Sequence, residues 1–323
     1  MMGNGIRRLA AAKMALVWLA LTAIVLVSCR VLGRPVGPWI AGPLAGLCLS
    51  LTASLVVSER LKRDPGLFVF HVGLALLVGL VAVGRLMAFD GHVEVTRGTT
   101  LDPAQVQGEG GPLHFHHFEE ASFLQGPFSV SYARGVKRRE TRSQVTLPEG
   151  RELVVGDDVP LILGGYRFYT THNKGFAPLL AWVVGDRVET GAVHLPSYPI
   201  NEFRQGLEWR LPDGSGAVTL WLALARPGFE EEASWTFPPP VEAKLVVVEA
   251  TGKRHELAPG ETAVLPGGRL RYESLSSWMG YRIFFDPTLP WLAVAAVVAS
   301  GGLGMYALRR LSEVTGEEVR HAA

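Results

Sequence analysis

The sequence predicts a membrane protein of the α+β class, with four transmembrane helices and an all-β, sandwich-like domain inserted between helices three and four. Residues 14–87 and 289–308 are rich in Leu, Val and Ala, whereas residues 88–288 have an ordinary polar and charged content. Within the polar stretch, short runs of Val, Tyr, Phe and Thr alternate with turn residues, which is typical of strands. This uneven composition indicates a membrane anchor and one water-facing domain.

Four segments have the roughly 20 apolar residues that a helix needs to cross a bilayer core about 30 Å thick. Three lie in the N-terminal membrane region, 1–87, at about 14–32, 39–57 and 67–87. The fourth, 289–308, opens the C-terminal region 289–323. The first apolar run is too long for the core of a signal peptide and leads through "GRPVGP" straight into the second span, so we expect it to be retained.

The positions of Lys and Arg in the short flanks predict the orientation of these spans. Three flanks are basic, with Arg7, Arg8 and Lys13 before the first span, Arg60, Lys62 and Arg63 between the second and third, and Arg309 and Arg310 after the fourth. Short loops rich in Lys and Arg stay in the cytoplasm. We therefore expect a multi-pass protein of the bacterial inner membrane, with both termini cytoplasmic and the large domain periplasmic.

The domain at 88–288 is predicted to be built from many short strands. Its runs are bounded by Gly, Pro, Asp or Asn, and include "HVEVTRG", "FSVSYARG", "YRFYTTH", "AVTLWLALA", "AKLVVVEATG" and "YRIFFD". Such a pattern favours an antiparallel sandwich or an open β-rich barrel. The stiff "FPPP" at 237–240 is a candidate connector between two sheets.

The cysteines, the net charge and the absence of several known motifs argue against some classes of function for this chain. The two cysteines, Cys29 and Cys48, lie in apolar runs, so the polar domain closes without a disulfide, and no C-x-x-C-H haem attachment motif occurs. The formal net charge of +1 without clustered Lys and Arg gives no indication of a nucleic-acid partner. No nucleophile elbow, phosphate-binding loop or zinc-protease motif is present. These observations favour a non-catalytic subunit over an enzyme.

His71 is the main candidate functional residue, because it lies inside the predicted span 67–87. On a helix it shares a face with small residues that allow another helix to approach closely, namely Ala75, Val78, Gly79 and Ala82. One reading is structural, with the imidazole hydrogen-bonded to a neighbouring helix. The other is ligation, because neutral imidazole is the usual axial ligand of haem iron and a second chain could supply the other ligand.

The stretch "LHFHHFEE" at 113–120 contains the densest set of possible metal ligands. On a strand, His114 and His116 point to one side and His117 to the other, and two histidines on one face are candidate ligands of zinc or copper. Exposed histidines without a function are the simpler reading, and no third ligand at a fixed spacing is evident. The scattered His92, His172, His194 and His255 are expected to be ordinary surface or loop residues.

The order of the segments resembles that of the ResB (or CcsB) family of cytochrome c biogenesis proteins, of which this chain would be a short member. Three stretches carry the resemblance: "FVFHVGLALLVGLVAVGRLMAFDGHVEVTRGTTL", "VPLILGGYRFYTTHNKG" and "YESLSSWMGYRIFFDPTLPWLAVAAVV". The resemblance implies that the chain helps to export haem and present it for attachment to apocytochrome c, beside a multi-span ResC- or CcsA-like partner. By its motif position, the family's third-span haem ligand falls on His71.

The resemblance also implies how haem is held. Haem b would be bound transiently and shared with the partner. The chain itself would also contact membrane lipid, and it would not complete the transfer alone. None of its eight tryptophans forms the partner's tryptophan-rich haem-handling motif. Two alternatives stay open: a membrane-tethered extracytoplasmic scaffold without haem, and a metal-delivery protein acting through His114, His116 and His117.

Overall fold

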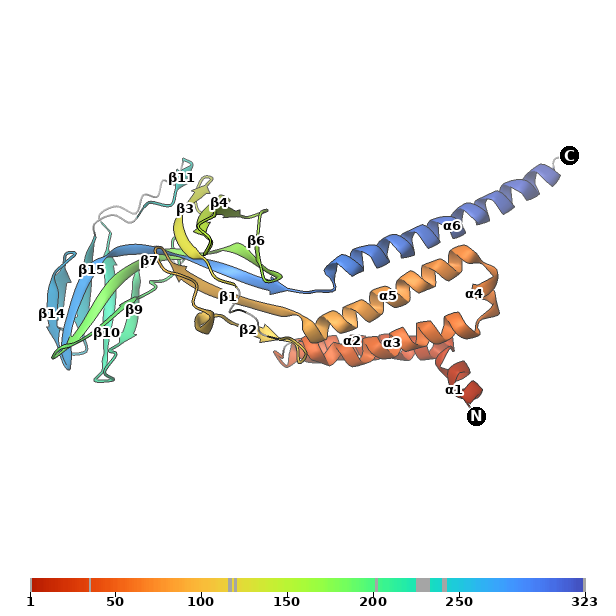
Figure 1. The fold of residues 1–323 in the computed structure, drawn as a ribbon, viewed down its shortest axis with the longest axis horizontal. Helices are drawn as coiled ribbons and strands as arrows, with labels where there is room; N and C mark the ends of the chain where they lie inside the picture. Colours follow the sequence, from red (N-terminus) through yellow and green to blue (C-terminus); the bar gives the residue numbers. More distant parts are fainter. Residues whose placement is uncertain are drawn as a thin grey trace. The chain divides into compact units, whose positions relative to one another are not determined.

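The computed structural model of this chain divides into two compact units (Figure 1). It describes residues 2–34, 36–115, 118, 121–200, 203–224, 233–239 and 243–321. The helical unit comprises Met1–Phe89, Glu109–His116 and Phe285–Ala323, and the β unit comprises Asp90–Gly108 and His117–Phe284. The predicted α+β class with a β-rich region between the third and last apolar helices is confirmed.

The helical unit contains four helices that are long and apolar enough to cross a membrane. Its helices are α1 (Met2–Leu9), α2 (Ala12–Val31), α3 (Gly37–Val57), α4 (Glu59–Arg63), α5 (Pro65–Met87) and α6 (Leu289–His321). The α5 helix begins where the sequence signals a start, because Asp64 accepts a hydrogen bond from the Leu67 N–H and Pro65 needs no such partner. The α6 helix continues beyond the predicted end at residue 308.

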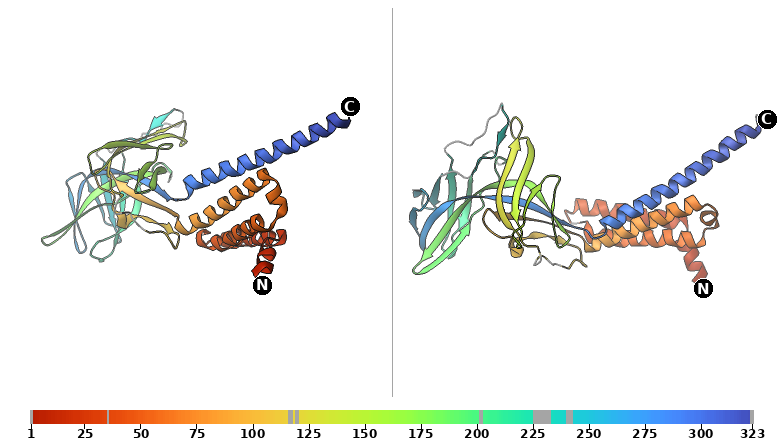
Figure 2. Two further views of the ribbon diagram at one scale, coloured as in Figure 1. Left: turned by 45° about the vertical axis from the view of Figure 1, so that its right-hand side comes forward. Right: turned by 45° about the horizontal axis from the view of Figure 1, so that its top comes forward.

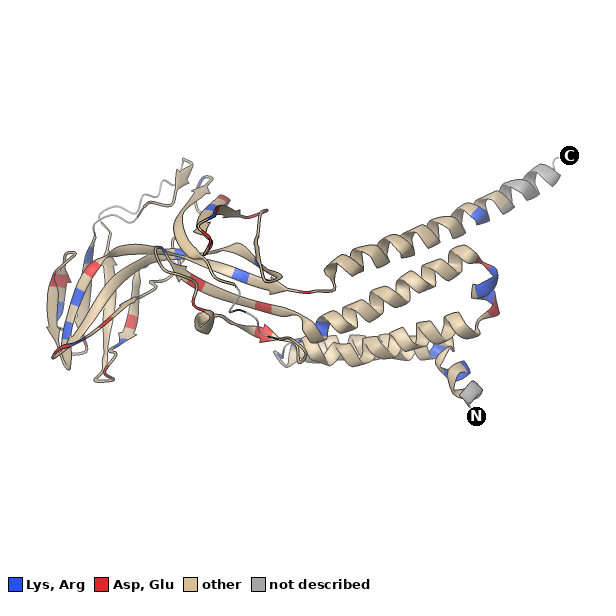
Figure 3. Ribbon diagram, in the orientation of Figure 1, with Lys and Arg blue, Asp and Glu red and all other residues tan. Residues whose placement is uncertain are grey.

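The basic flanks gather at one end of the helical unit. The Ser54 hydroxyl near the end of α3 donates to the Ala10 carbonyl, which follows α1. Near the start of α5, Gly66 lies against the backbone of Tyr306 on α6. These contacts bring together the basic residues of the three flanks, coloured blue in Figure 3: Arg7, Arg8, Lys13, Arg60, Lys62, Arg63, Arg309 and Arg310.

The β unit consists of three antiparallel sheets, seen from two further directions in Figure 2. A seven-stranded sheet has the order β2-β1-β15-β7-β6, with β14 paired to β15 and β8 to β7; two four-stranded sheets have the orders β13-β12-β10-β9 and β11-β3-β4-β5. The strands are β1 (Phe89–Thr96), β2 (Gln107–Gly110), β3 (Leu124–Tyr132), β4 (Arg138–Thr146), β5 (Glu152–Gly156), β6 (Leu161–Leu163), β7 (Tyr166–Val184), β8 (Arg187–Ala192), β9 (Gly206–Arg210), β10 (Ala217–Ala223), β11 (Trp235–Thr236), β12 (Lys244–Glu249), β13 (Arg254–Leu257), β14 (Thr262–Leu265) and β15 (Gly268–Phe285), and a short 3₁₀ turn, η1, covers Pro103–Gln105.

Two long strands, β7 and β15, run through the β unit, and the two halves of each strand pack against different sets of side chains. They pair antiparallel from Arg269 opposite Val183 to Phe284 opposite Arg167. The second half of β7 and the first half of β15 pack against β10 and β12, around a cluster that includes Leu180, Trp182, Val218, Leu220, Leu245, Val247, Leu270 and Tyr272.

The other halves of the two long strands pack against the β3-β4 side of the unit. The Phe123 ring lies edge-on to Phe168 of β7 at 5.6 Å and to Tyr281 of β15 at 5.5 Å. The predicted connector "FPPP" leads from β11 towards β12, which belongs to the other four-stranded sheet. Its Phe237 is buried and packs on Phe128 and Phe176, while Pro240 lies outside the described residues.

Candidate functional site

His71 occupies the second turn of α5 and is partly buried within the helical unit. Its Nδ1 atom lies 2.8 Å from the Leu67 carbonyl oxygen, and the Phe70 ring meets the imidazole edge-on at 5.2 Å. A carbonyl can only accept, so Nδ1 carries a proton, and in a neutral imidazole Nε2 then keeps its lone pair. Among the described residues, none forms a hydrogen bond with Nε2.

The small residues that follow His71 lie against α3. Ala75 and Ala82 are buried, and the Cys48 thiol of α3 donates to the Ala75 carbonyl at 3.4 Å. A Cβ atom added to Gly79 would lie 3.1 Å from the Cys48 sulfur. The face that carries Ala75, Gly79 and Ala82 therefore brings α3 close to α5.

A second small-residue face of α5 packs on α6. A Cβ atom added to Gly73 would meet the backbone of Ala299 at 2.5 Å, and one added to Gly302 of α6 would collide with the backbone of Phe70. Glycines at these positions let two helix backbones approach without an intervening side chain. His71 therefore lies on a helix, α5, that packs closely against both α3 and α6.

The geometry of His71 fits one axial ligand of a haem. Metal-bound histidines usually donate the proton of the non-ligating ring nitrogen to a carbonyl or carboxylate, which sets the tautomer and the ring orientation. The Leu67 carbonyl makes that contact here, and Nε2 would be the ligand. Among the described residues, no second histidine lies in the four apolar helical segments that could cross a membrane.

His114 is packed among aromatic rings at the end of the helical unit. It is buried, its Nδ1 lies 3.0 Å from the Met87 carbonyl oxygen, and it stacks on Phe89 at 5.2 Å and meets Phe285 at 5.3 Å. His116 and His117 lie outside the described residues. Within the described part of the chain, no group of three or more His, Cys, Asp or Glu residues is arranged to hold a metal ion.

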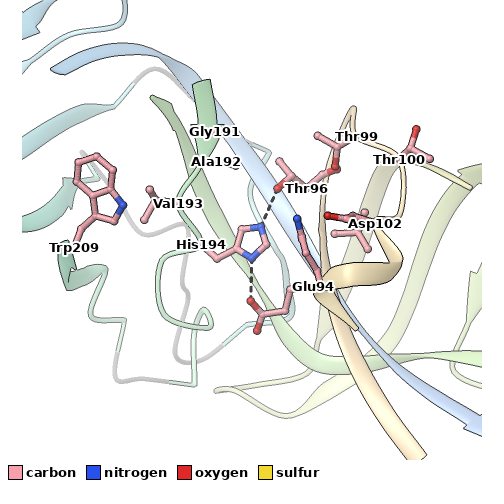
Figure 4. Close-up of a pocket in the computed structure, with 12 residues that line it drawn as sticks. Glu94, Thr96, Thr99, Thr100, Asp102, Gly191, Ala192, Val193, His194 and Trp209 are labelled. Atoms are coloured by element: carbon pink, nitrogen blue, oxygen red, sulfur yellow. Dashed lines mark hydrogen bonds and ion pairs between the residues drawn. The ribbon is translucent and has the colours of Figure 1, made fainter. Parts of the chain in front are cut away.

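A further polar site lies in the β unit, where His194 connects two residues of β1 (Figure 4). The Glu94 Oε2 atom lies 2.9 Å from His194 Nδ1, and the Thr96 hydroxyl lies 2.8 Å from Nε2. The carboxylate accepts a hydrogen bond from Nδ1–H, so that in a neutral imidazole Nε2 accepts one from the Thr96 hydroxyl. The imidazole stacks on the Trp278 ring at 5.2 Å.

These three residues line a cavity of about 580 Å³, which also includes Asp102, Val193 and Trp209. Sequence reasoning did not single out this site, because it treated His194 as an ordinary loop residue. Glu94 and Thr96 are two apart on a strand and so point to the same side, but the histidine that joins them is about a hundred residues away. His194 lies in the loop after β8, so the three side chains come together only through the tertiary fold.

Lys174 is the most deeply buried charged residue described in the β unit, with 1% of its surface exposed. Its Nζ donates to the His172 carbonyl at 2.9 Å and lies 5.2 Å from the centre of the Tyr132 ring. Burial, assisted by the nearby positive charge of Arg138, lowers the pKa of Lys174 to about 8. Asp157 is 3.1 Å from Arg138 and only partly offsets this effect.

The comparisons with known proteins include a weak structural neighbour of this chain. No protein-family model matches the chain, and no curated protein matches it in sequence. A solved structure described as "Cytochrome c Heme Lyase CcmF" is similar, with 13% sequence identity and a TM-score of 0.27, over 91% of this chain and 34% of that chain. This chain therefore spans about a third of the length of that protein. The resemblance to the ResB family stays a prediction.

Proposed function

We propose that this chain is a haem-handling membrane subunit of a cytochrome c maturation complex, in which His71 is one axial ligand of a transiently held haem b. The observation that carries the proposal is the hydrogen bond of His71, whose Nδ1–H donates to the Leu67 carbonyl while no described residue bonds to Nε2. The ResB-like order of the sequence segments supports the same role. Haem, when bound, would be the group that is delivered for attachment to apocytochrome c.

The distribution of charge supports an orientation in the bacterial inner membrane. The basic residues of three flanks lie at one end of the helical unit, which is the pattern of a cytoplasmic end. His71 follows the start of α5 by less than two turns and so lies near that end. In this orientation the β unit is extracytoplasmic, and haem would be held towards the cytoplasmic side of the membrane.

A multi-span partner of the ResC or CcsA type is part of the proposal. Haem, when bound, would need contacts beyond the one imidazole of His71, and a partner subunit would supply them. Large apolar side chains of α2 are exposed and would meet either lipid or such a partner; they include Leu16, Leu19, Ile24 and Val27. The chain acts in this view by holding and presenting haem, without a catalytic step of its own.

The test is the haem content of the complex purified from its native membrane, so that any partner is retained. We expect the wild type to show a b-type pyridine haemochrome, and His71→Gly to lose it, since glycine removes the imidazole. Free imidazole added to His71→Gly should restore the spectrum by filling the space. His92→Gly is the matched control, because His92 is exposed on β1. Full haem content and cytochrome c maturation in His71→Gly would disprove the ligand role.

A scaffold without haem is the second candidate function. It is favoured by the hydrogen bond between His71 Nδ1 and the Leu67 carbonyl, because both residues belong to α5 and the bond forms without any ligand. This candidate predicts no haemochrome in the wild-type complex and unchanged cytochrome c maturation in His71→Gly.

A further inference from the structure

We infer that the free edge of β8, with the groove beside it, binds an extended basic polypeptide segment by strand addition. β8 pairs with β7 alone among the described strands, and none of its residues is buried. Natural sheets usually protect such an edge with a bulge, a proline or a covering loop, because its backbone groups can pair with another chain. A second chain segment is therefore the expected partner of this edge.

The pairing register shows which backbone groups of β8 are free. Val193 N–H donates to the Pro178 carbonyl, and residues 191, 189 and 187 repeat this hydrogen-bonded position along the ladder. The alternate residues, Val188, Thr190 and Ala192, direct their N–H and C=O groups away from β7. No described residue pairs with these outward groups, so an extended peptide could bond to each of them.

A continuous groove runs along β8. Three cavities of about 420, 170 and 580 Å³ follow one another, and each shares lining residues with the next. Trp182 and Glu189 belong to the first two cavities, and Val193 and Trp209 to the last two. The indole of Trp209, from β9, stands beside Val193 in Figure 4 and forms part of the opposite wall.

The groove has unoccupied space beside Gly191, which has no side chain. Gly191 pairs with Leu180 of β7, and Leu180 belongs to the core between the two sheets. A Cβ atom added to Gly191 would meet no atom within 4 Å, so the space above it is free. A side chain of a bound strand would fit there, because alternate residues of a strand point to the same face.

The charge of the groove selects a basic occupant. Five carboxylates line the three cavities, on Glu94, Asp102, Asp186, Glu189 and Asp213, against the single guanidinium of Arg187. Hydrogen bonds from Ser215 hold the pKa of Asp213 below its usual value, so this group stays ionised near neutral pH. Electrostatic complementarity of this kind favours segments rich in Lys or Arg and rejects acidic ones.

Strand addition obtains its affinity from main-chain hydrogen bonds and its specificity from alternate side chains. An occupant must therefore be locally unfolded, as an apocytochrome segment is before haem attachment. The identification of the peptide as an apocytochrome segment rests on the proposed function. The binding of a basic peptide to β8 requires no haem.

The test is the binding of short labelled peptides to the full-length chain in detergent, followed by fluorescence anisotropy. The probes are a ten-residue peptide of alternating Lys and Val, the same peptide with Glu in place of Lys, and a Lys peptide N-methylated at alternate residues. We expect only the unmodified Lys peptide to bind well, and added salt to weaken its binding. The N-methylated peptide fails because it lacks donors for the edge of β8.

Two variants locate the peptide in the groove. Gly191→Leu should fill the space beside this residue and weaken binding of the Lys peptide at least tenfold, without disturbing the fold. The double change Asp186→Asn and Glu189→Gln should weaken binding several-fold and reduce its salt dependence. Glu152→Gln is the control, because Glu152 is an exposed carboxylate on β5, away from the groove residues. Circular dichroism checks that each variant is folded.

The outcomes separate this inference from the proposed function. Equal binding of Lys and Glu peptides, or unchanged binding in Gly191→Leu, would overturn the inference even if the wild type holds haem. Self-association that Gly191→Leu abolishes, with no peptide binding, would assign the edge to a second copy of the chain and equally overturn it. Lys-peptide binding by a wild type that lacks haem would support the groove and contradict only the haem role.

Discussion

The Nδ1 atom of His71 lies 2.8 Å from the carbonyl oxygen of Leu67, one turn back on the same helix. This hydrogen bond does not join two helices, so the fold depends little on it. We predict that His71→Phe changes the free energy of unfolding by less than about 1 kcal/mol, since one local hydrogen bond contributes about that much. Haem content should nevertheless be lost. Thermal unfolding and a haemochrome spectrum of one preparation measure both. A large loss of stability would show that the histidine is structural.

The neighbouring glycines Gly301 and Gly302 of α6 give a matched test of the contact between α5 and α6. Gly302 faces the backbone of Phe70, whereas a side chain at Gly301 would meet nothing within 4 Å. Alanine is favoured over glycine in a helix by about 1 kcal/mol, so Gly301→Ala should stabilise slightly. Gly302→Ala should destabilise by about 1–3 kcal/mol, because the two helices must separate. Equal effects in thermal unfolding would contradict the close packing.

Three buried side chains close a ring of hydrogen bonds in the β unit. Tyr281 donates to the Gln125 Oε1 at 2.7 Å, the Gln125 amide donates to Ser143 at 2.9 Å, and Ser143 donates to Tyr281 at 2.7 Å. Removing the phenolic hydroxyl leaves the Gln125 Oε1 and the Ser143 O–H without this partner, at a cost of about 1–3 kcal/mol. We predict this loss for Tyr281→Phe in chemical denaturation. Tyr272→Phe breaks one hydrogen bond, to the Ala243 carbonyl, and should cost less.

The spans and the β-rich class were predictable because both depend on local patterns of residues. The length of an apolar run is set by the thickness of the bilayer, and α2, α3 and α5 begin within two residues of their predicted starts. His71 stood out as a candidate because a titratable group is rare in such a run, and its role as a ligand stays a prediction.

The two long strands were not predictable in the same way. The run "YRFYTTH" and the Asn173 that follows it predict a short strand and a turn, but β7 continues to Val184. Gly175 is needed there for close approach, since a Cβ atom would lie 2.8 Å from the Trp278 indole nitrogen. The edge position of β8 and the Glu94–His194 contact likewise depend on which strands pair across the sheet, which no short motif specifies.

The buried Lys174 should make the free energy of unfolding of the protein rise with pH in the alkaline range. Burial lowers the pKa of its ammonium group from 10.5 to about 8 in the folded protein. Between these two values the unfolded chain binds more protons than the folded chain, so the free energy of unfolding must rise with pH. The burial of Tyr198, which raises its pKa to about 12, acts in the opposite direction only above about pH 10, where an unfolded tyrosine ionises.

We therefore predict that the wild type gains about 2 kcal/mol of stability between pH 7 and pH 9.5, and that Lys174→Met abolishes this gain. At pH 7 the methionine variant should be the more stable protein by about 1–3 kcal/mol, since the cost of burying a charge without a carboxylate partner is removed. Chemical denaturation at the two pH values, followed by tryptophan fluorescence, measures both effects. Lys253→Met is the control, because that side chain is 64% exposed and should leave the slope unchanged. A Lys174→Met variant that keeps the wild-type slope would show that this ammonium is not the group that titrates.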